Sequence, residues 1–194
     1  LNDKNVDPDS ILADINIFGY DLFQKNQPST FAPTDIASVP SDYLVNPGDE
    51  INLLLWGRIN EEYKLQVSRD GIVTIPRIGP VAVGGLSFDS MKKNISDRVD
   101  KIEGVNSTIS MGKLRSIGVY IVGEVRSPGF YTVSALSSVT NALFSAGGPT
   151  NNGSLRNVQL KRNGAIIANI DYYDFILSGN DRTGLRLQSG DVII

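Results

Sequence analysis

The sequence predicts an α+β fold of two small β-rich domains, the second of them a β-grasp in which a sheet wraps one helix. Three observations predict it. Short apolar segments alternate with Gly, Pro and Asn turns, as in antiparallel strands. Two longer segments repeat their apolar residues with the period of a helix. Each of these helical segments follows a pair of strand-like segments, which gives the order strand, strand, helix in both halves.

Composition excludes several classes of function. The chain has 194 residues, 41% hydrophobic and 20% charged, and a net charge of -3, so it is long enough for two cores. The near balance of charge argues against nucleic acid as a partner. The chain has no Cys and no His, which removes His-based catalytic triads, zinc sites built on these residues and the usual general base. We therefore expect no enzyme, no catalytic residue, no metal site and no cofactor.

Neither end of the chain carries a membrane or targeting signal. The longest apolar run, Ile51 to Trp56, is far shorter than the roughly 20 residues of a membrane helix. The chain starts at Leu1, and residues 191–194 resemble an unfinished strand. We expect a fragment whose ends, and any segment in them, have been removed.

Residues 1–42 are predicted to form an N-terminal arm. Asp9 is placed to cap a short helix, and residues 26–40, rich in Pro, Ser and Thr, favour an extended chain. Between them lies an aromatic cluster, Phe18 to Phe23. This cluster either docks on the body of the protein or contacts a neighbouring subunit.

The first predicted domain covers residues 43–114. Residues 46–49 form a turn, and Ile51 to Trp56 is a strand that is apolar on both faces and hence central. Residues 63–68 and 72–75 are predicted to form a hairpin around residues 69–71. Residues 81–83 and 108–111 are further strands. A helix capped by Ser87 has its apolar positions in one stripe, at Phe88, Met91, Ile95, Val99 and Ile102.

The second predicted domain covers residues 115–194. Residues 117–122 and 130–133 are strands joined by a turn at Pro128-Gly129. Ser137 or Ser138 caps a helix that ends at Gly147-Gly148. The remaining signals are a hairpin around Asn163-Gly164, a short helix from Asp171, and a last strand after Ser189-Gly190-Asp191.

Several segments resemble one known family. Tyr43 to Ile51, Leu55-Trp56-Gly57 and Asp70 to Val81 resemble, in order and spacing, the export domain of the polysaccharide export family of Gram-negative bacteria, the Wza-type outer-membrane auxiliary proteins. Residues 122–131, 146–149 and 187–193 resemble the SLBB domain, a soluble-ligand-binding β-grasp module. Together the match spans about residues 43–194.

The residues that carry this resemblance are mostly turn formers, and we interpret them as structural positions rather than ligand contacts. They are Pro47, Gly48, Asp49, Trp56, Asp70, Gly71, Gly79, Gly123, Pro128, Gly129, Gly147, Gly148, Gly190 and Asp191. Core packing is the favoured interpretation for Trp56, whereas a sugar-stacking role would require an exposed indole. Ligand-binding residues are not identified.

The resemblance implies the periplasmic part of an outer-membrane translocon that exports capsule or exopolysaccharide. It implies a ring of identical subunits around a polysaccharide cargo, attached to the outer membrane by segments absent here. An inner-membrane polysaccharide co-polymerase or tyrosine autokinase would be the partner. The alternative is a ligand- or carbohydrate-binding β-grasp module without a pore, with a groove lined by Trp56, Tyr120 or Tyr131. An enzyme using Asp171 and Asp174 is a third hypothesis, though the pair fits a helix start better.

Overall fold

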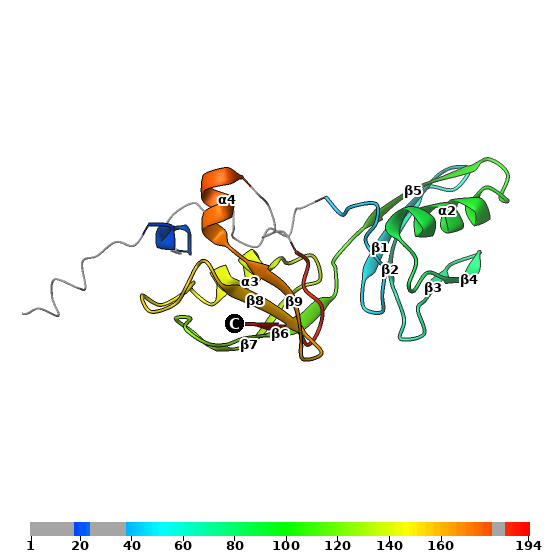
Figure 1. The fold of residues 1–194 in the computed structure, drawn as a ribbon. Coiled ribbons are helices and arrows are strands. Elements are labelled where there is room, and N and C mark those ends of the chain that lie inside the picture. The colour runs from blue at the N-terminus through cyan, green and yellow to red at the C-terminus, as the bar shows by residue number, and fades with distance from the viewer. Residues whose placement is uncertain (1–17, 24–37, 180–184) are drawn as a thin grey trace, which may run out of the picture. The chain divides into compact units, whose positions relative to one another are not determined.

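The computed structural model describes residues 18–23, 38–179 and 185–194 (Figure 1). Strands dominate, with three α-helices in the described residues, so the α+β prediction is confirmed. The described chain forms two compact units. The first unit comprises residues 38–117 and 134–136. The second unit comprises residues 18–23, 118–133, 137–179 and 185–194.

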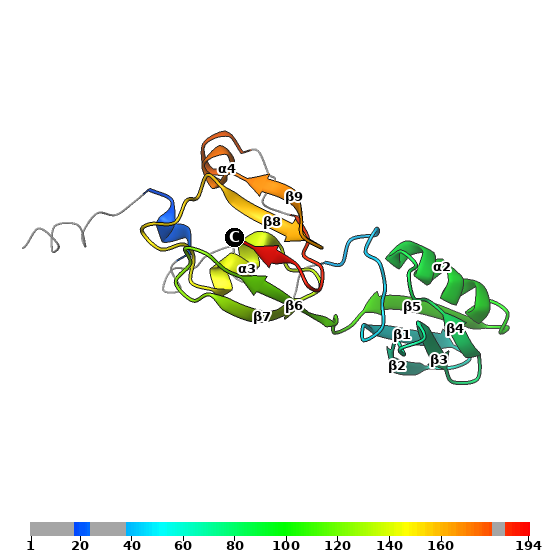
Figure 2. The same cartoon turned by 60° about the horizontal axis from the view of Figure 1, so that its bottom comes forward.

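The first unit packs one helix against one face of a three-stranded antiparallel sheet of order β2-β1-β5, with a separate two-stranded sheet beside it (Figure 2). The elements are β1 (Glu50–Gly57), β2 (Glu61–Gln66), β3 (Ile72–Ile75), β4 (Gly79–Ala82), α2 (Phe88–Val99) and β5 (Val105–Met111).

Helix α2 forms as its sequence predicts. The Ser87 hydroxyl accepts a hydrogen bond from the Ser90 backbone N–H, which satisfies one of the free donors of the first turn. The stripe of Met91, Ile95 and Val99 is fully buried. Burying each such side chain contributes about 1.5–3 kcal/mol, so this stripe fixes the helix on the sheet.

Strand β1 is central, as predicted, but only one of its faces is buried. Ile51, Leu53 and Leu55 point into the core, whereas Leu54 and Trp56 are 44% and 49% exposed. The prediction that Trp56 packs in the core is therefore wrong. An apolar run suits a strand covered on both sides, but α2 covers only one.

The predicted hairpin of residues 63–68 with 72–75 is also wrong. Residues 69–71 do turn the chain, with Gly71 N–H donating to the Ser68 carbonyl at 3.0 Å. However, β3 pairs with β4, not with β2. The backbones of Gly71 and Gly84 explain this pairing, because a Cβ on Gly71 would lie 3.0 Å from the Gly84 Cα. The missing side chains permit this approach, and the N–H groups of Val83 and Gly84 both donate to the Gly71 carbonyl at 2.8 Å.

The second unit is a five-stranded mixed sheet of order β7-β6-β10-β8-β9 with α3 against its inner face (Figure 2). Strand β10 lies between β6, to which it is parallel, and β8, to which it is antiparallel. The elements are β6 (Ser116–Ile121, which begins in the first unit), β7 (Gly129–Ser134), α3 (Val139–Ser145), β8 (Val158–Arg162), β9 (Ala165–Ile170), α4 (Tyr172–Ser178) and β10 (Val192–Ile193).

Local signals account for the helix and hairpin of this unit. Ser138, not Ser137, is the N-cap of α3, in a capping box with Asn141. Gly147 and Gly148, at φ 82° and 77°, close its C-terminus. The Asn163-Gly164 turn joins β8 to β9 as predicted, with positive φ at both residues.

The turn predicted at Pro128-Gly129 is partly correct, since Pro128 belongs to the connection between the two strands but Gly129 does not. Gly129 is the first residue of β7, and the chain reverses earlier, over residues 122–128. Val125 bridges to Pro149, and the Tyr131 hydroxyl donates to the Ser127 carbonyl. The Val125 bridge holds the connection beside the residues that follow α3, and the Tyr131 bond holds it beside β7.

The aromatic cluster near the N-terminus docks on the second unit, as one of its two interpretations predicts. Residues Tyr20–Phe23 form the 3-10 helix η1. Phe23 is 2% exposed and meets the Tyr172 ring edge-on at 5.6 Å. A Cβ on Gly148 would collide with Phe23, so glycine makes room for it. The helix predicted at Asp9 and residues 26–37 of the predicted extended segment lie outside the described residues.

Candidate functional site

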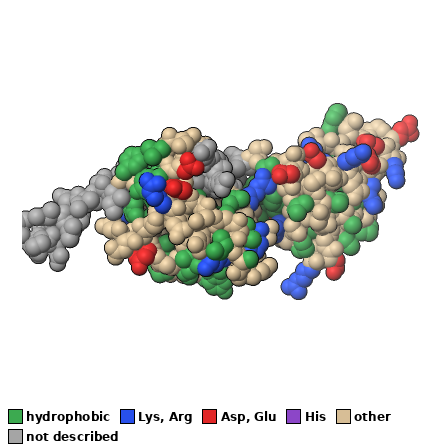
Figure 3. All heavy atoms as spheres, viewed as in Figure 1, with side chains coloured by type: hydrophobic (Ala, Val, Ile, Leu, Met, Phe, Trp, Pro, Cys, Tyr) green, Lys and Arg blue, Asp and Glu red, His purple; other side chains and the backbone are tan. Residues whose placement is uncertain are grey.

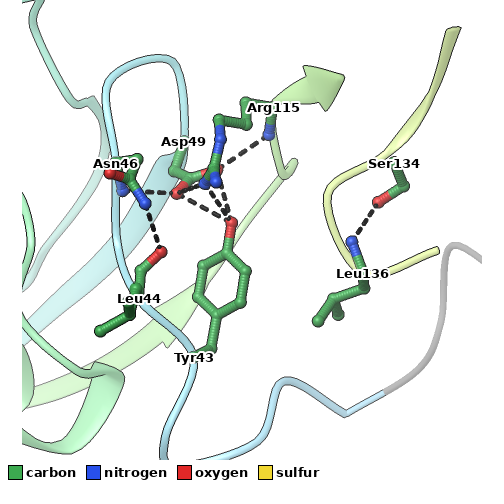
Figure 4. Close-up of polar contacts among 7 residues, drawn as sticks. All are labelled: Tyr43, Leu44, Asn46, Asp49, Arg115, Ser134 and Leu136. Carbon is green, nitrogen blue, oxygen red and sulfur yellow. Dashed lines mark hydrogen bonds and ion pairs between the residues drawn. The ribbon is translucent and has the colours of Figure 1, made fainter. Parts of the chain in front are cut away.

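The Asp49 carboxylate is the centre of a buried network in the first unit (Figure 4). Gly48, at φ 94°, turns the chain so that the carboxylate faces back across the loop. Its two oxygens accept hydrogen bonds from the backbone N–H groups of Asn46, at 2.8 Å, and Arg115, at 2.9 Å. These bonds fix the turn at the entry to β1.

Two side chains complete this network. The Tyr43 hydroxyl lies 2.9 Å from both Asp49 oxygens, and the Arg115 Nη1 donates to that hydroxyl at 2.7 Å and to Asp49 at 2.9 Å. Burial, and then the nearby Asp49 charge, raises the pKa of Tyr43, so its hydroxyl keeps its proton. The carboxylate is fully engaged by protein donors, which makes this turn a structural element.

Asp191 occupies a matching turn in the second unit. It follows Gly190, at φ 86°, and its buried carboxylate accepts the Gln188 backbone N–H at 2.8 Å. The Arg162 guanidinium binds it through two bonds, Nε at 2.8 Å and Nη2 at 2.9 Å. The hydrogen bond to Asp191 raises the pKa of Arg162. Arg162 is thus largely buried against Asp191.

The other motif glycines and their neighbours have backbone roles. Asp70 is exposed in the turn before β3. Pro128 is exposed, and Pro47 precedes the positive-φ Gly48 in its turn. Positive φ values occur at Gly71, Gly79 and Gly123, at 73°, 98° and 84°. The structure brings none of these residues together around a common point within either unit.

The carboxylates of the enzyme hypothesis lie at the start of α4. Asp171 is the N-cap, and its Oδ1 accepts the N–H groups of Tyr173 and Asp174. Its other oxygen lies 3.6 Å from Arg156. Asp174 sits in the first turn, where the helix dipole favours a carboxylate. These contacts explain both residues as parts of a helix start.

One face of the first unit's sheet leaves Trp56 accessible. The registers place Asn52, Leu54 and Trp56 on the side away from α2. Their neighbours on this side are polar, among them Lys64 of β2 and Thr108 of β5. The exposed indole thus meets the condition that a sugar-stacking role requires, which the sequence could not decide.

The outer face of the second unit's sheet carries a pair of exposed aromatic rings. Tyr120 of β6 and Phe130 of β7 are 47% and 60% exposed, and their ring centroids lie 5.2 Å apart. The Phe130 ring covers Gly118, where a Cβ would collide with it. In Figure 3, hydrophobic side chains gather over β6 and β7.

Phe130 is the residue of this surface that the sequence interpretation missed. Tyr131, named in its place, is one position along the strand and points to the other side. Strand alternation could have identified Phe130, because Tyr131 lies two positions from the buried Val133 and therefore on the same face of the strand. Phe130 therefore had to face outward with Thr132.

Beside Gly123 the second unit has an open hollow of about 390 Å³. Polar side chains, including Glu124 and Asn152, line it together with apolar ones such as Val125 and Leu143. Glu124 is held from one side by the Thr150 hydroxyl at 2.9 Å. The hollow is open and has no buried charged group among its lining residues, so it defines no particular ligand.

Residues 37–112 match the family described as polysaccharide biosynthesis/export protein, and residues 119–169 match the SLBB domain. The chain is also 34% identical, over 182 residues, to two polysialic acid transport proteins KpsD of Escherichia coli. The alignments cover 92% of this chain and 32% of each relative.

The chain belongs to the polysaccharide export family. The resemblance stated from the sequence motifs is thus confirmed, with an export domain in the first unit and an SLBB domain in the second. Trp56 lies in the export domain, and Tyr120 and Phe130 lie in the SLBB domain. The chain spans about a third of the length of the relatives it matches.

No group of three or more acidic side chains in residues 18–23, 38–179 and 185–194 is arranged to hold a metal ion. In the same part of the chain, no helix has the length and apolar character needed to cross a membrane.

Proposed function

We propose that the protein is a non-catalytic component of a polysaccharide export translocon, located in the periplasm and attached to the outer membrane. Identical subunits would pack side by side into a ring around the polymer. In this proposal residues 43–114 and 115–194 are its two domains and residues 1–42 an arm. In the same proposal the motif residues have structural roles, although Trp56 is exposed rather than packed in the core.

The observation that carries this proposal is the tandem order of an export domain and an SLBB domain in one chain that is similar to polysialic acid transport proteins. The cargo would be a capsule or exopolysaccharide, such as an acidic polymer of the kind those relatives transport. Contacts between unlike surfaces of adjacent copies close into a ring when the rotation per subunit permits it. An inner-membrane co-polymerase or tyrosine autokinase would be the partner that controls passage.

Negative-stain imaging of the full-length protein in mild detergent tests this proposal. We expect closed rings with an open lumen. Stable monomers under the same conditions would contradict the conduit. Deleting the gene in its host and measuring surface polysaccharide, with re-expression as the control, tests the export role independently of the ring.

The second candidate function is a carbohydrate-binding module that forms no pore. The exposed aromatic rings on the open sheet faces favour it, because sugar rings stack on such surfaces. This candidate predicts saturable binding by a monomer. A monomer that binds short oligosaccharides, with surface polysaccharide unchanged on deletion, would favour it over the translocon.

A further inference from the structure

The outer face of the SLBB-domain sheet carries one continuous row of side chains. Tyr120 pairs with Val192, Val192 with Lys161, and Lys161 with Ile166. Directly paired residues on neighbouring strands share a face. With Phe130 beside Tyr120, the row crosses all five strands of the sheet.

This row stays open to solvent because the helix packs on the other side. The inward positions of the same strands, such as Val119, Leu160 and Ile193, are at most 1% exposed. In the row itself, Phe130 and Ile166 are 60% and 58% exposed. An apolar row of this length on a solvated face is typical of a binding surface.

The charge of this face has one sign. The outward positions of the five strands are Gly118, Tyr120, Phe130, Thr132, Gln159, Lys161, Ile166, Asn169 and Val192, and only Lys161 is charged. Within the described part of the chain, Lys161 makes no ion pair. Its ammonium group is therefore available to an anion that approaches the sheet.

The spacing in the row fits two adjacent units of a polymer. Tyr120 and Lys161 are two strands apart, which is roughly 10 Å at the usual strand spacing. A sugar ring stacked on Tyr120 and Phe130 would leave the next sugar near the Lys161 side chain. The amides of Gln159 and Asn169 lie on the same face to bond hydroxyl groups.

We propose that this row binds a carboxylate-bearing polysaccharide, with one sugar on Tyr120 and Phe130 and the acid group of a neighbouring sugar on Lys161. The proposal rests on the proposed export function and adds to it a binding site for an acidic polymer. Charge complementarity favours this occupant, because the face offers a cation and no anion. Exposed contacts are individually weak, which suits a polymer that must move along the surface.

Titration of the full-length protein with tetragalacturonic acid tests the site, with maltotetraose as the neutral probe. We expect the acidic tetramer to bind more tightly, and its affinity to fall at high salt. Lys161→Gln should weaken acidic binding about fivefold and remove its salt dependence. Phe130→Ala should weaken binding of both tetramers about tenfold, as for loss of a stacking ring.

Phe18→Ala is the matched control, since Phe18 is an equally exposed aromatic residue of the same unit that stacks on Tyr173, away from the row. It should leave binding unchanged. Circular dichroism confirms that each variant is folded, and Lys161→Gln keeps the test decisive if Phe130→Ala is unstable. Equal binding of the acidic and neutral tetramers, or unchanged binding by both variants, would overturn the site.

The test separates this site from other outcomes. If a second copy of the chain occupies the row, Phe130→Ala will abolish self-association in sedimentation while oligosaccharide binding stays unchanged, and the proposal is overturned. If rings form but neither variant affects binding, the site fails and the translocon stands. If acidic binding depends on Lys161 in a protein that forms no ring, the site stands and the conduit fails.

Discussion

The turns at Asp49 and Asp191 share a backbone but differ in how their carboxylates are held. In each, a glycine with positive φ precedes the aspartate, whose carboxylate accepts the N–H of the residue three positions earlier at 2.8 Å. The aspartate N–H returns a bond of 3.1 Å to that residue's carbonyl. The Asp49 carboxylate also accepts hydrogen bonds from the Tyr43 hydroxyl and the Arg115 guanidinium, whereas the Asp191 carboxylate accepts two from Arg162, through Nε and Nη2.

The difference shows which contacts of each turn come from neighbouring residues in the sequence and which come from distant ones. The hydrogen bonds within four residues follow from the Gly-Asp sequence itself. The arginine partners lie 66 and 29 positions away in the chain, on different elements. The same turn is thus fixed in two domains by two unrelated tertiary contacts, one shared among several donors and one concentrated in a single side chain.

Removing either carboxylate should have the largest effect. Asp49→Ala or Asp191→Ala leaves an arginine with a lost partner in a largely buried site, so each should lower the free energy of unfolding of its own unit by about 3–5 kcal/mol. Because the protein has two units, each transition needs its own probe. Trp56 is the only tryptophan in the chain and lies in the first unit. Urea unfolding followed by its fluorescence should shift for Asp49→Ala.

Asp191→Ala provides the matched comparison in this experiment. It should shift the transition seen by circular dichroism while moving the Trp56 transition little. Asp70→Ala, at an exposed turn carboxylate, is the neutral control. Equal shifts of the Trp56 transition by both buried-aspartate variants would show that the two turns are not separate supports.

Arginine-to-lysine substitutions separate the two ways of holding the carboxylate. Arg162→Lys loses one of two parallel charge-assisted bonds, so it should cost about 1.5–3 kcal/mol. Arg115→Lys should cost less, because Arg115 reaches Asp49 and Tyr43 through Nη1 alone, and an ammonium group can bond both. The free energy of unfolding from urea titrations checks the order. A larger cost at Arg115 would contradict it.

Alanine at the two turn glycines tests the shared backbone. Both residues have positive φ, where a Cβ costs about 1–2 kcal/mol. Gly48→Ala should cost more than Gly190→Ala, because its Cβ would also lie 3.3 Å from the Arg115 Cβ, whereas the space at Gly190 is open. Thermal unfolding of the two variants side by side measures the difference. Equal costs would show that the contact with Arg115 adapts without strain.

Local chemistry explains which features the sequence predicts and which it does not. The caps at Ser87 and Asp171 and the Asn163-Gly164 turn depend on neighbours within a few residues, and the structure has them as predicted. The exposure of Trp56 depends on how many helices cover a sheet, which no local pattern records. The pairing of β3 with β4 similarly depends on a glycine contact across 13 residues.

The candidate binding surfaces likewise contain some features that the sequence predicts and others that it does not. Strand alternation alone places Phe130 on the side opposite to Val133, so its outward direction was predictable. The row from Tyr120 to Ile166 was not, since it requires β10 to lie between β6 and β8. Sequence order gives no sign that a strand at residues 192–193 pairs with residues 120–121 in the sheet.

The smallest predicted effect is a loss of stability at high pH that depends on Tyr43 and therefore on the turn at Asp49. Tyr43→Phe removes one hydroxyl from the Asp49 network and should cost about 1 kcal/mol at neutral pH. Burial raises the pKa of Tyr43 above its ordinary value of 10.0, so the folded protein holds this proton more tightly than the unfolded chain. The resulting stability is complete below about pH 10 and is lost as pH rises further.

Unfolding followed by Trp56 fluorescence at about pH 8 and about pH 11 measures this loss. The wild-type protein should lose more stability over this interval than Tyr43→Phe does, because only the wild type carries the hydroxyl that resists ionisation. Tyr172→Phe is the matched control, since burial also raises the pKa of Tyr172, but in the second unit. It should leave the slope seen by Trp56 unchanged. If the slope is the same with and without the Tyr43 hydroxyl, Tyr43 holds Asp49 only by packing, and the network of the first turn reduces to an arginine pair like that of the second.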